Sequence, residues 1–159
     1  MQGDPDVIEL LNEVLTAELT AINQYFLDAK MLDNWGIERL AHHFRDASID
    51  EMKDAERVTD RILYLDGVPN YQRLGGVKIG ETAMEKLRLA LDLEKEAIER
   101  YNRGVDLARS KGDNGTREML ADLLVDEEEH ADWLETQLDA ANAVGEANYL
   151  AQNLHEDDD

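Results

Sequence analysis

Two similar stretches, ELTAINQY at residues 18–25 and EKEAIERY at residues 94–101, decide the fold that we predict for this chain. They lie 76 residues apart and share a glutamate, an alanine, an isoleucine and a tyrosine at equivalent positions. The same offset aligns the Asp-Glu pair at residues 50–51 with the Asp-Glu pair at residues 126–127. Because separate segments repeat at one offset, we interpret the chain as a doubled helical hairpin.

Apolar residues recur with helical spacing in four long segments around these stretches. The first begins after Asp4, a capping residue that is followed by a proline at the first helical position. Glycine and proline at residues 66–70 end the second segment, and TAME at residues 82–85 has the capping-box pattern that opens the third. We expect long helices at about residues 4–34, 37–65, 82–111 and 116–145, and a short C-terminal helix at residues 147–154.

The connection at residues 66–81 contains two breaks rich in glycine or proline and no helical pattern. It can reach about 50 Å when extended, whereas a helix of about 29 residues is about 43 Å long. The connection is therefore long enough to run the length of a helix and return the chain to its starting end. Since the other links are tight, we predict an all-α four-helix bundle of two antiparallel hairpins with one long crossover, forming a single domain over residues 1–159.

Each apolar seam is interrupted near its middle by polar side chains, although unpaired buried charges cost several kcal/mol. Glu18 lies 17 residues before the tight turn near residue 35, and Glu51 lies 16 residues after it. In antiparallel helices the two side chains therefore reach the same level. A similar count holds around the second tight turn, and we expect six groups to converge: Glu18, Glu51, Asp54, Glu94, Glu127 and His130.

A cluster of five carboxylates and one imidazole indicates metal binding. A lone seam glutamate is more often a surface residue in the wrong register, but four seams interrupted at one level favour a buried cluster. Ionised carboxylates about 4 Å apart repel strongly at low effective dielectric, and two divalent cations would supply the compensating charge. Oxygen-rich ligation with one imidazole suits iron or manganese, so we predict a di-metal site inside the bundle.

The overall composition disfavours several other classes of protein. The chain has 159 residues and no cysteine, which excludes a disulfide scaffold, a thiol nucleophile and cysteine-ligated zinc or iron–sulfur sites. Its net charge of −21, from 37 acidic and 16 basic residues, disfavours nucleic acid as a partner. No apolar run approaches the roughly 18 residues of a membrane span, and we expect a cytoplasmic protein. The acidic surface is either simply solubilising or suited to handling cations.

Several stretches make the chain resemble the bacterioferritins over essentially its whole length. They are MQGD at residues 1–4, ELTAINQYF at 18–26, DEMK at 50–53, RIL at 61–63, DEEEH at 126–130 and DWLET at 132–136. The resemblance implies a ferritin-like four-helix bundle that assembles into a hollow cage of twenty-four subunits. It also implies a ferroxidase, which oxidises Fe(II) with O₂ or peroxide at a di-iron centre inside each subunit and stores ferric mineral in the cage.

The resemblance also implies roles for individual residues. The catalytic ligands of two iron ions would be Glu18, Glu51, Glu94, Glu127 and His130, with Glu51 and Glu127 bridging the metals. Tyr25 would be a redox-active phenol close to the centre. An ordinary core tyrosine is the alternative at this position.

One ligand departs from the family pattern, because Asp54 stands where the bacterioferritins have histidine. The aspartate oxygen reaches about as far from the backbone as the nearer imidazole nitrogen, so ligation stays geometrically feasible. Five carboxylates with two Fe(II) would leave a formal charge of −1, where the usual set leaves zero. We expect Asp54 to ligate and either to lower the potential of the centre or to take up a proton. The alternative is a haem-carrying structural subunit of a mixed cage, with an impaired ferroxidase centre.

Met52 follows Glu51 but is turned about 100° away from the seam, which is typical of packing at a subunit interface. The resemblance implies that this interface is two-fold and that a haem b is shared between two subunits, ligated by a pair of methionine sulfurs. Met52 would be that ligand. The residues expected to line the haem are Asn23, Phe26, Ile49 and Lys53.

The implied partners are other copies of this chain, as a 24-mer of two-fold dimers, with or without a second type of subunit. A ferredoxin-like electron donor for iron release is also implied. Asp46 and Asp50 precede Asp54 by two turns and one turn, and they are either surface charge or a transit site for iron. The spacing gives no role to three of the histidines, His42, His43 and His155.

Two further ferritin-like classes fit less well. A DNA-protecting mini-ferritin needs metal sites between subunits and usually a basic arm, and the chain offers neither. A rubrerythrin-type peroxidase needs a cysteine-ligated iron domain, which a chain without cysteine cannot form.

Overall fold

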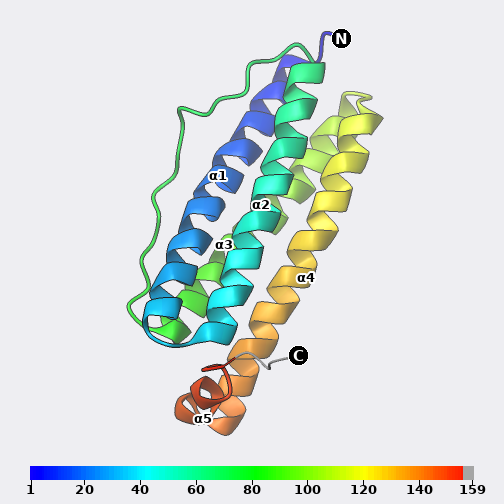
Figure 1. Cartoon of the computed structure of the whole chain (residues 1–159). Helices are drawn as coiled ribbons and strands as arrows, with labels where there is room; N and C mark the ends of the chain where they lie inside the picture. The colour runs from blue at the N-terminus through cyan, green and yellow to red at the C-terminus, as the bar shows by residue number, and fades with distance from the viewer. Residues whose placement is uncertain (156–159) are drawn as a thin grey trace.

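The computed structural model describes residues 1–155, and within this range the chain is helical and contains no strand. The helices are α1 (Pro5–Asn34), α2 (Glu38–Tyr64), α3 (Ala83–Ser110), α4 (Asn114–Val144) and α5 (Glu146–Ala151). The first four form an elongated bundle, and α5 lies at one end of it (Figure 1). None of the helices in residues 1–155 combines the length and apolar composition that crossing a bilayer requires. The predicted all-α architecture is confirmed, while the last four residues of the predicted domain lie outside the described residues.

Side-chain caps fix where three of the helices begin. Asp4 lies just before α1, and its carboxylate accepts a hydrogen bond from the N–H of Asp6, as its position before Pro5 predicts. The Thr82 hydroxyl accepts from the N–H of Glu85 at the start of α3. The Glu85 carboxylate in turn accepts from the N–H of Glu81, one residue before the cap.

The start of α4 differs from our expectation of about residue 116. Asp113 is the N-cap, so the helix begins at Asn114. Its carboxylate accepts hydrogen bonds from the N–H of Thr116 at 3.0 Å and from the Arg61 guanidinium at 2.8 Å. The ion pair with Arg61 ties the end of α2 to the start of α4, and this contact between distant segments was not visible in the local sequence pattern.

The long crossover runs beside α1 from the end of α2 to the opposite end of the bundle, where α3 begins (Figure 1). Polar side chains of α1 hold its backbone along the way. Asn12 accepts from the N–H of Asn70 at 2.8 Å, Thr20 from Gly75 at 2.9 Å and Gln24 from Lys78 at 3.1 Å. The predicted topology of two antiparallel hairpins joined by a crossover is confirmed.

The C-terminal segment covers the start of α2. Helix α5 is shorter than the expected 147–154, and Tyr149 is its buried residue. The chain after α5 supplies the carbonyls of Asn153 and Leu154, which accept hydrogen bonds from the N–H groups of Arg39 and Glu38. These carbonyls take the place of a side-chain cap, which α2 lacks.

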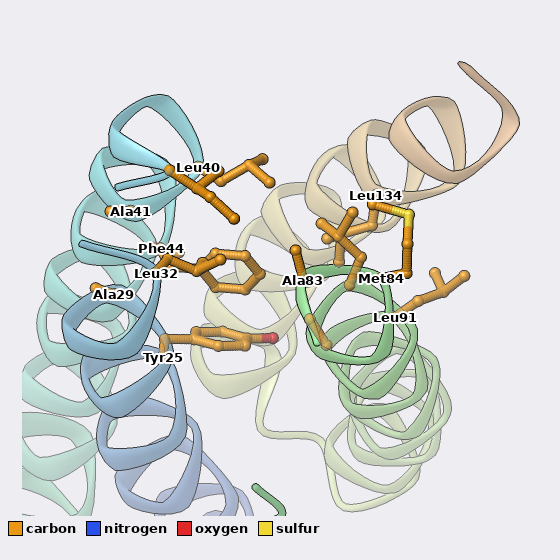
Figure 2. Close-up of a cluster of buried hydrophobic side chains, with 14 of the residues drawn as sticks. Tyr25, Ala29, Leu32, Leu40, Ala41, Phe44, Ala83, Met84, Leu91 and Leu134 are labelled. Atoms are coloured by element: carbon orange, nitrogen blue, oxygen red, sulfur yellow. The ribbon is translucent and has the colours of Figure 1, made fainter. Parts of the chain in front are cut away.

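The apolar interior consists of two clusters at different levels of the bundle. In one cluster, side chains including Tyr25, Phe44 and Leu134 point toward one another from different helices (Figure 2). The other cluster includes Leu11 and Leu123 and lies in the half of the bundle that contains the N-terminus (Figure 1). On each long helix, the seam glutamate stands in the sequence between residues of the two clusters. The bundle therefore places an acidic layer between two apolar ones.

Candidate metal centre

Each of the four long helices contributes one glutamate to the buried acidic layer. The exposed fractions of these side chains are 3% for Glu18, 5% for Glu51, 1% for Glu94 and 3% for Glu127. Four carboxyl groups buried at one level need compensating protons or cations, because an isolated buried charge is strongly unfavourable. The helical period had placed these residues inside, and the structure does bring them together.

Their ligand atoms form two groups, each within the dimensions of a metal site. One group comprises Glu51, Glu94 and His130, and the other comprises Glu18, Glu51, Asp54 and Glu127. Within each group the candidate ligand atoms all lie within 4.8 Å of one another. Glu51 belongs to both groups. The six residues selected from the sequence therefore lie around two adjacent positions that share one carboxylate.

Two tyrosines, one on α1 and one on α3, donate hydrogen bonds to the cluster. The Tyr25 hydroxyl of α1 donates to Oε1 of Glu94 on α3, and the Tyr101 hydroxyl of α3 donates to Oε1 of Glu18 on α1 at 2.5 Å. Each tyrosine lies seven residues after the glutamate of its own helix, so the two contacts are equivalent halves of the doubled sequence. Tyr101 was missed as a site residue, although its alignment with Tyr25 was the signal that could have found it.

The second carboxylate oxygens are left without partners. Oε2 of Glu18 and Oε2 of Glu94 are buried and accept no hydrogen bond from any described residue. Burial raises the pKa of Glu18 to about 7, and it also raises the pKa of Glu94. Burial, followed by the neighbouring Glu94 carboxyl, raises the pKa of Glu127 to about 10. Hard oxygen donors that lack partners and resist ionisation are what a cation in this layer would satisfy.

Asp54 belongs to this environment rather than to the outer surface. Its carboxylate lies in the group with Glu18, Glu51 and Glu127. Burial, and then the charge of Glu18, raises the pKa of Asp54 to about 7. Asp54 is thus the sixth residue of the candidate ligand set.

His130 is held between a carboxylate and a second histidine. Its Nδ1 lies 2.8 Å from Oε1 of Glu94, and its Nε2 lies 3.0 Å from Nε2 of His43. Burial lowers the pKa of both imidazoles, to about 3 for His43. His43 was not predicted as a site residue. The signal that could have found it is its position eight residues, or about two turns, before Glu51 on the same face of α2.

Two open cavities reach the cluster from different faces. A cavity of about 330 Å³ borders α1, α3 and the crossover, and Arg73, Lys78 and Arg100 are its basic residues. A cavity of about 640 Å³ lies between α2 and α4, and its wall includes Asp46 and Asp50 as well as cluster residues. The two aspartates that we considered as a transit site therefore line a cavity that also borders residues of the acidic cluster.

Met52 lies away from the cluster, on the outer face of α1 and α2. Its side chain is 55% exposed and borders a cleft of about 690 Å³ that is also lined by Leu19, Ile22, Leu74 and Asn23. Of the expected lining residues, Asn23 is part of the wall. The other three are exposed and lie outside it: Phe26, Ile49 and Lys53.

A four-helix bundle with a long crossover and a buried cluster of glutamates and histidine defines the ferritin-like class of proteins. In agreement, the family model described as "Ferritin-like domain" matches residues 8–144.

Individual relatives narrow this class further. The chain is 53% identical over 152 residues to "Bacterioferritin BfrA" of Mycobacterium tuberculosis, covering 96% of each chain. It is 53% identical over 151 residues to the bacterioferritin of Streptomyces coelicolor, covering 95% of this chain and 90% of the relative. A solved structure of M. tuberculosis bacterioferritin BfrA superposes with a TM-score of 0.96 at 52% identity, covering 98% of each chain. The chain belongs to the bacterioferritin family of iron-storage proteins.

Proposed function

We propose that this protein oxidises Fe(II) to Fe(III) at the buried cluster and stores the ferric product inside a cage of twenty-four subunits. The observation that carries the proposal is the pair of ligand groups that share Glu51. Two iron ions would be held at these positions, with Glu51 shared between the two ligand groups. Glu127, which the family resemblance implies as a second bridge, belongs only to the group that contains Asp54. Adjacent iron ions can pass electrons to O₂ or peroxide, which is the chemistry that a bound iron pair supplies.

The chain positions the carboxylate ligands of this site and leaves oxygen atoms available to bind a metal. Tyr25 and Tyr101 each occupy one oxygen of a glutamate and leave the other oxygen free. The apolar clusters close the acidic layer along the bundle axis and leave the two cavities at its sides as the routes to it. Protons that occupy the carboxyl groups in the absence of metal would leave as iron binds, because ligation requires the ionised form.

We propose that Asp54 is a ligand rather than a defect. Its grouping with three glutamates and its raised pKa support this assignment. An aspartate in place of the family's histidine adds one negative charge, which favours Fe(III) over Fe(II) or retains a proton at the site.

Rapid mixing of the homogeneous protein with Fe(II) tests both proposals. We expect fast oxidation of about two Fe(II) per subunit, and we expect Asp54→His to change the rate while keeping this stoichiometry. An identical rate in Asp54→His would remove any special role of the aspartate. Slow oxidation by the homogeneous protein, restored in the Asp54→His variant, would instead favour a structural subunit of a mixed cage.

We further propose that Met52 ligates a haem b shared by two subunits. The exposed thioether beside an apolar cleft supports this placement, since such a surface is suited to burial against a second copy. Protein produced with ample haem should show a Soret band that is lost in Met52→Leu. An unchanged band in that variant would contradict the assignment. For iron release, we propose that a ferredoxin-like electron donor reduces the stored ferric iron. We also expect the protein to be cytoplasmic.

A further inference from the structure

We propose that His43 is a positioning residue that orients the imidazole of His130 toward the metal centre through a hydrogen bond that can reverse its direction. The inference rests on the proposed function, because it concerns how one of the proposed iron ligands is presented. His43 is not in either candidate ligand group, and its role would be exerted through His130 alone.

The geometry leaves His43 one partner on the side of the cluster. Its Nε2 lies 3.0 Å from Nε2 of His130, the nitrogen that faces away from the carboxylates. The other nitrogen of His130, Nδ1, lies 2.8 Å from Glu94. The His130 ring is therefore fixed at both nitrogens, with Nδ1 directed at the cluster and Nε2 at α2.

His43 is itself held in place by two aromatic rings. It stacks on Trp133 of α4 with a centroid distance of 3.4 Å and an interplanar angle of 11°. Phe44 approaches it edge-on at 5.7 Å and 86°. A ring clamped in this way loses little further freedom when it hydrogen-bonds, so it can serve as a rigid support for His130.

An imidazole is an unusual choice for this support, because it can donate or accept. With Nδ1 of His130 protonated toward Glu94, Nε2 of His130 accepts from His43. A metal at the cluster needs the lone pair of Nδ1, which moves the His130 proton to Nε2 and makes that nitrogen the donor. His43 can then accept by carrying its own proton on Nδ1. A backbone carbonyl or a carboxylate could only accept, so it would support only the second state.

Cobalt titration of the assembled protein tests this role without relying on iron oxidation. Co(II) is added to metal-free wild type, His43→Leu and His43→Gln under conditions that exclude oxidation, and its visible absorption bands are followed. His42→Leu is the matched control, because it removes an exposed imidazole from the adjacent position. Circular dichroism and the thermal midpoint of each metal-free variant establish that the bundle is folded.

We expect wild type and His42→Leu to bind two Co(II) per subunit. In His43→Leu, one of the two should bind about 10- to 100-fold more weakly, which is the usual effect of losing an outer partner of a metal ligand. The other, held by the group that contains Asp54, should keep its affinity. His43→Gln should recover most of the loss, because an amide also donates and accepts.

Three results would overturn the inference. They are equal affinity in His43→Leu and wild type, equal weakening at both positions, and a loss in His43→Gln as large as in His43→Leu. The last result would mean that stacking on Trp133, rather than the hydrogen bond, matters. Failure of wild type to bind two Co(II) would instead refute the proposed metal centre, so the two failures are distinguishable.

Discussion

Replacing Glu18 by glutamine should stabilise the metal-free protein at neutral and alkaline pH. Burial raises the pKa of Glu18 from 4.5 to about 7. The folded protein therefore binds this proton more tightly than the unfolded chain does. The resulting stability is fully present below pH 4.5 and is lost as the pH rises through 7. This difference in pKa between the folded and unfolded chain corresponds to about 3 kcal/mol per subunit. Glutamine has no charge to desolvate and can still accept the hydrogen bond from Tyr101.

Scanning calorimetry of protein freed of metal with a chelator gives the measurement, at one protein concentration and at pH 4.5 and pH 8. At pH 8, Glu18→Gln should unfold about 6–12 °C above wild type, since 1 kcal/mol shifts the midpoint of a chain of this size by about 2–4 °C. At pH 4.5 the two proteins should differ little. The exposed Glu99 is the control position, and Glu99→Gln should track wild type. A Glu18→Gln variant no more stable than wild type at pH 8 would refute the assignment of a buried, destabilising carboxylate.

Three other predictions concern different parts of the chain. Asp28→Ala should lower the free energy of unfolding by about 3–5 kcal/mol in urea, because the buried ammonium of Lys86 loses the carboxylate that lies 2.9 Å away. Adding Lys86→Met should restore most of this loss. Asp126→Asn should slow Co(II) binding several-fold at low ionic strength by removing charge from the α2–α4 cavity, and Glu96→Gln, in the other cavity, should not. Tyr101→Phe should lower metal-free stability by about 1–3 kcal/mol at pH 5, because a buried carboxyl loses its donor.

Much of the architecture could be predicted because it is encoded locally or by periodicity. Asp4 with Pro5 and the Thr82 cap marked two helix starts, and the 76-residue offset revealed the doubled hairpin. The long crossover followed from comparing its extended length with that of a helix. The convergence of the acidic residues followed from counting residues outward from each tight turn.

Contacts between distant segments could not be predicted in the same way. The ion pair of Asp113 with Arg61 joins α4 to α2, and the carbonyls of residues 153 and 154 cap α2. Lys86 would be placed on a surface by its type, but it is buried against Asp28. The spacing of His43 from Glu51 could have placed it near the cluster, but not its partners His130 and Trp133, which lie on another helix. Each of these contacts depends on how distant segments pack against one another, which the sequence period leaves open.

Anomalous X-ray scattering from crystals soaked anaerobically in Fe(II) tests the central claim most directly. We predict two iron peaks in each subunit, one among Glu51, Glu94 and His130 and the other within reach of Glu18, Asp54 and Glu127. An acidic layer that stays free of iron at saturating Fe(II), or iron found only on the outer surfaces of the bundle, would contradict the account.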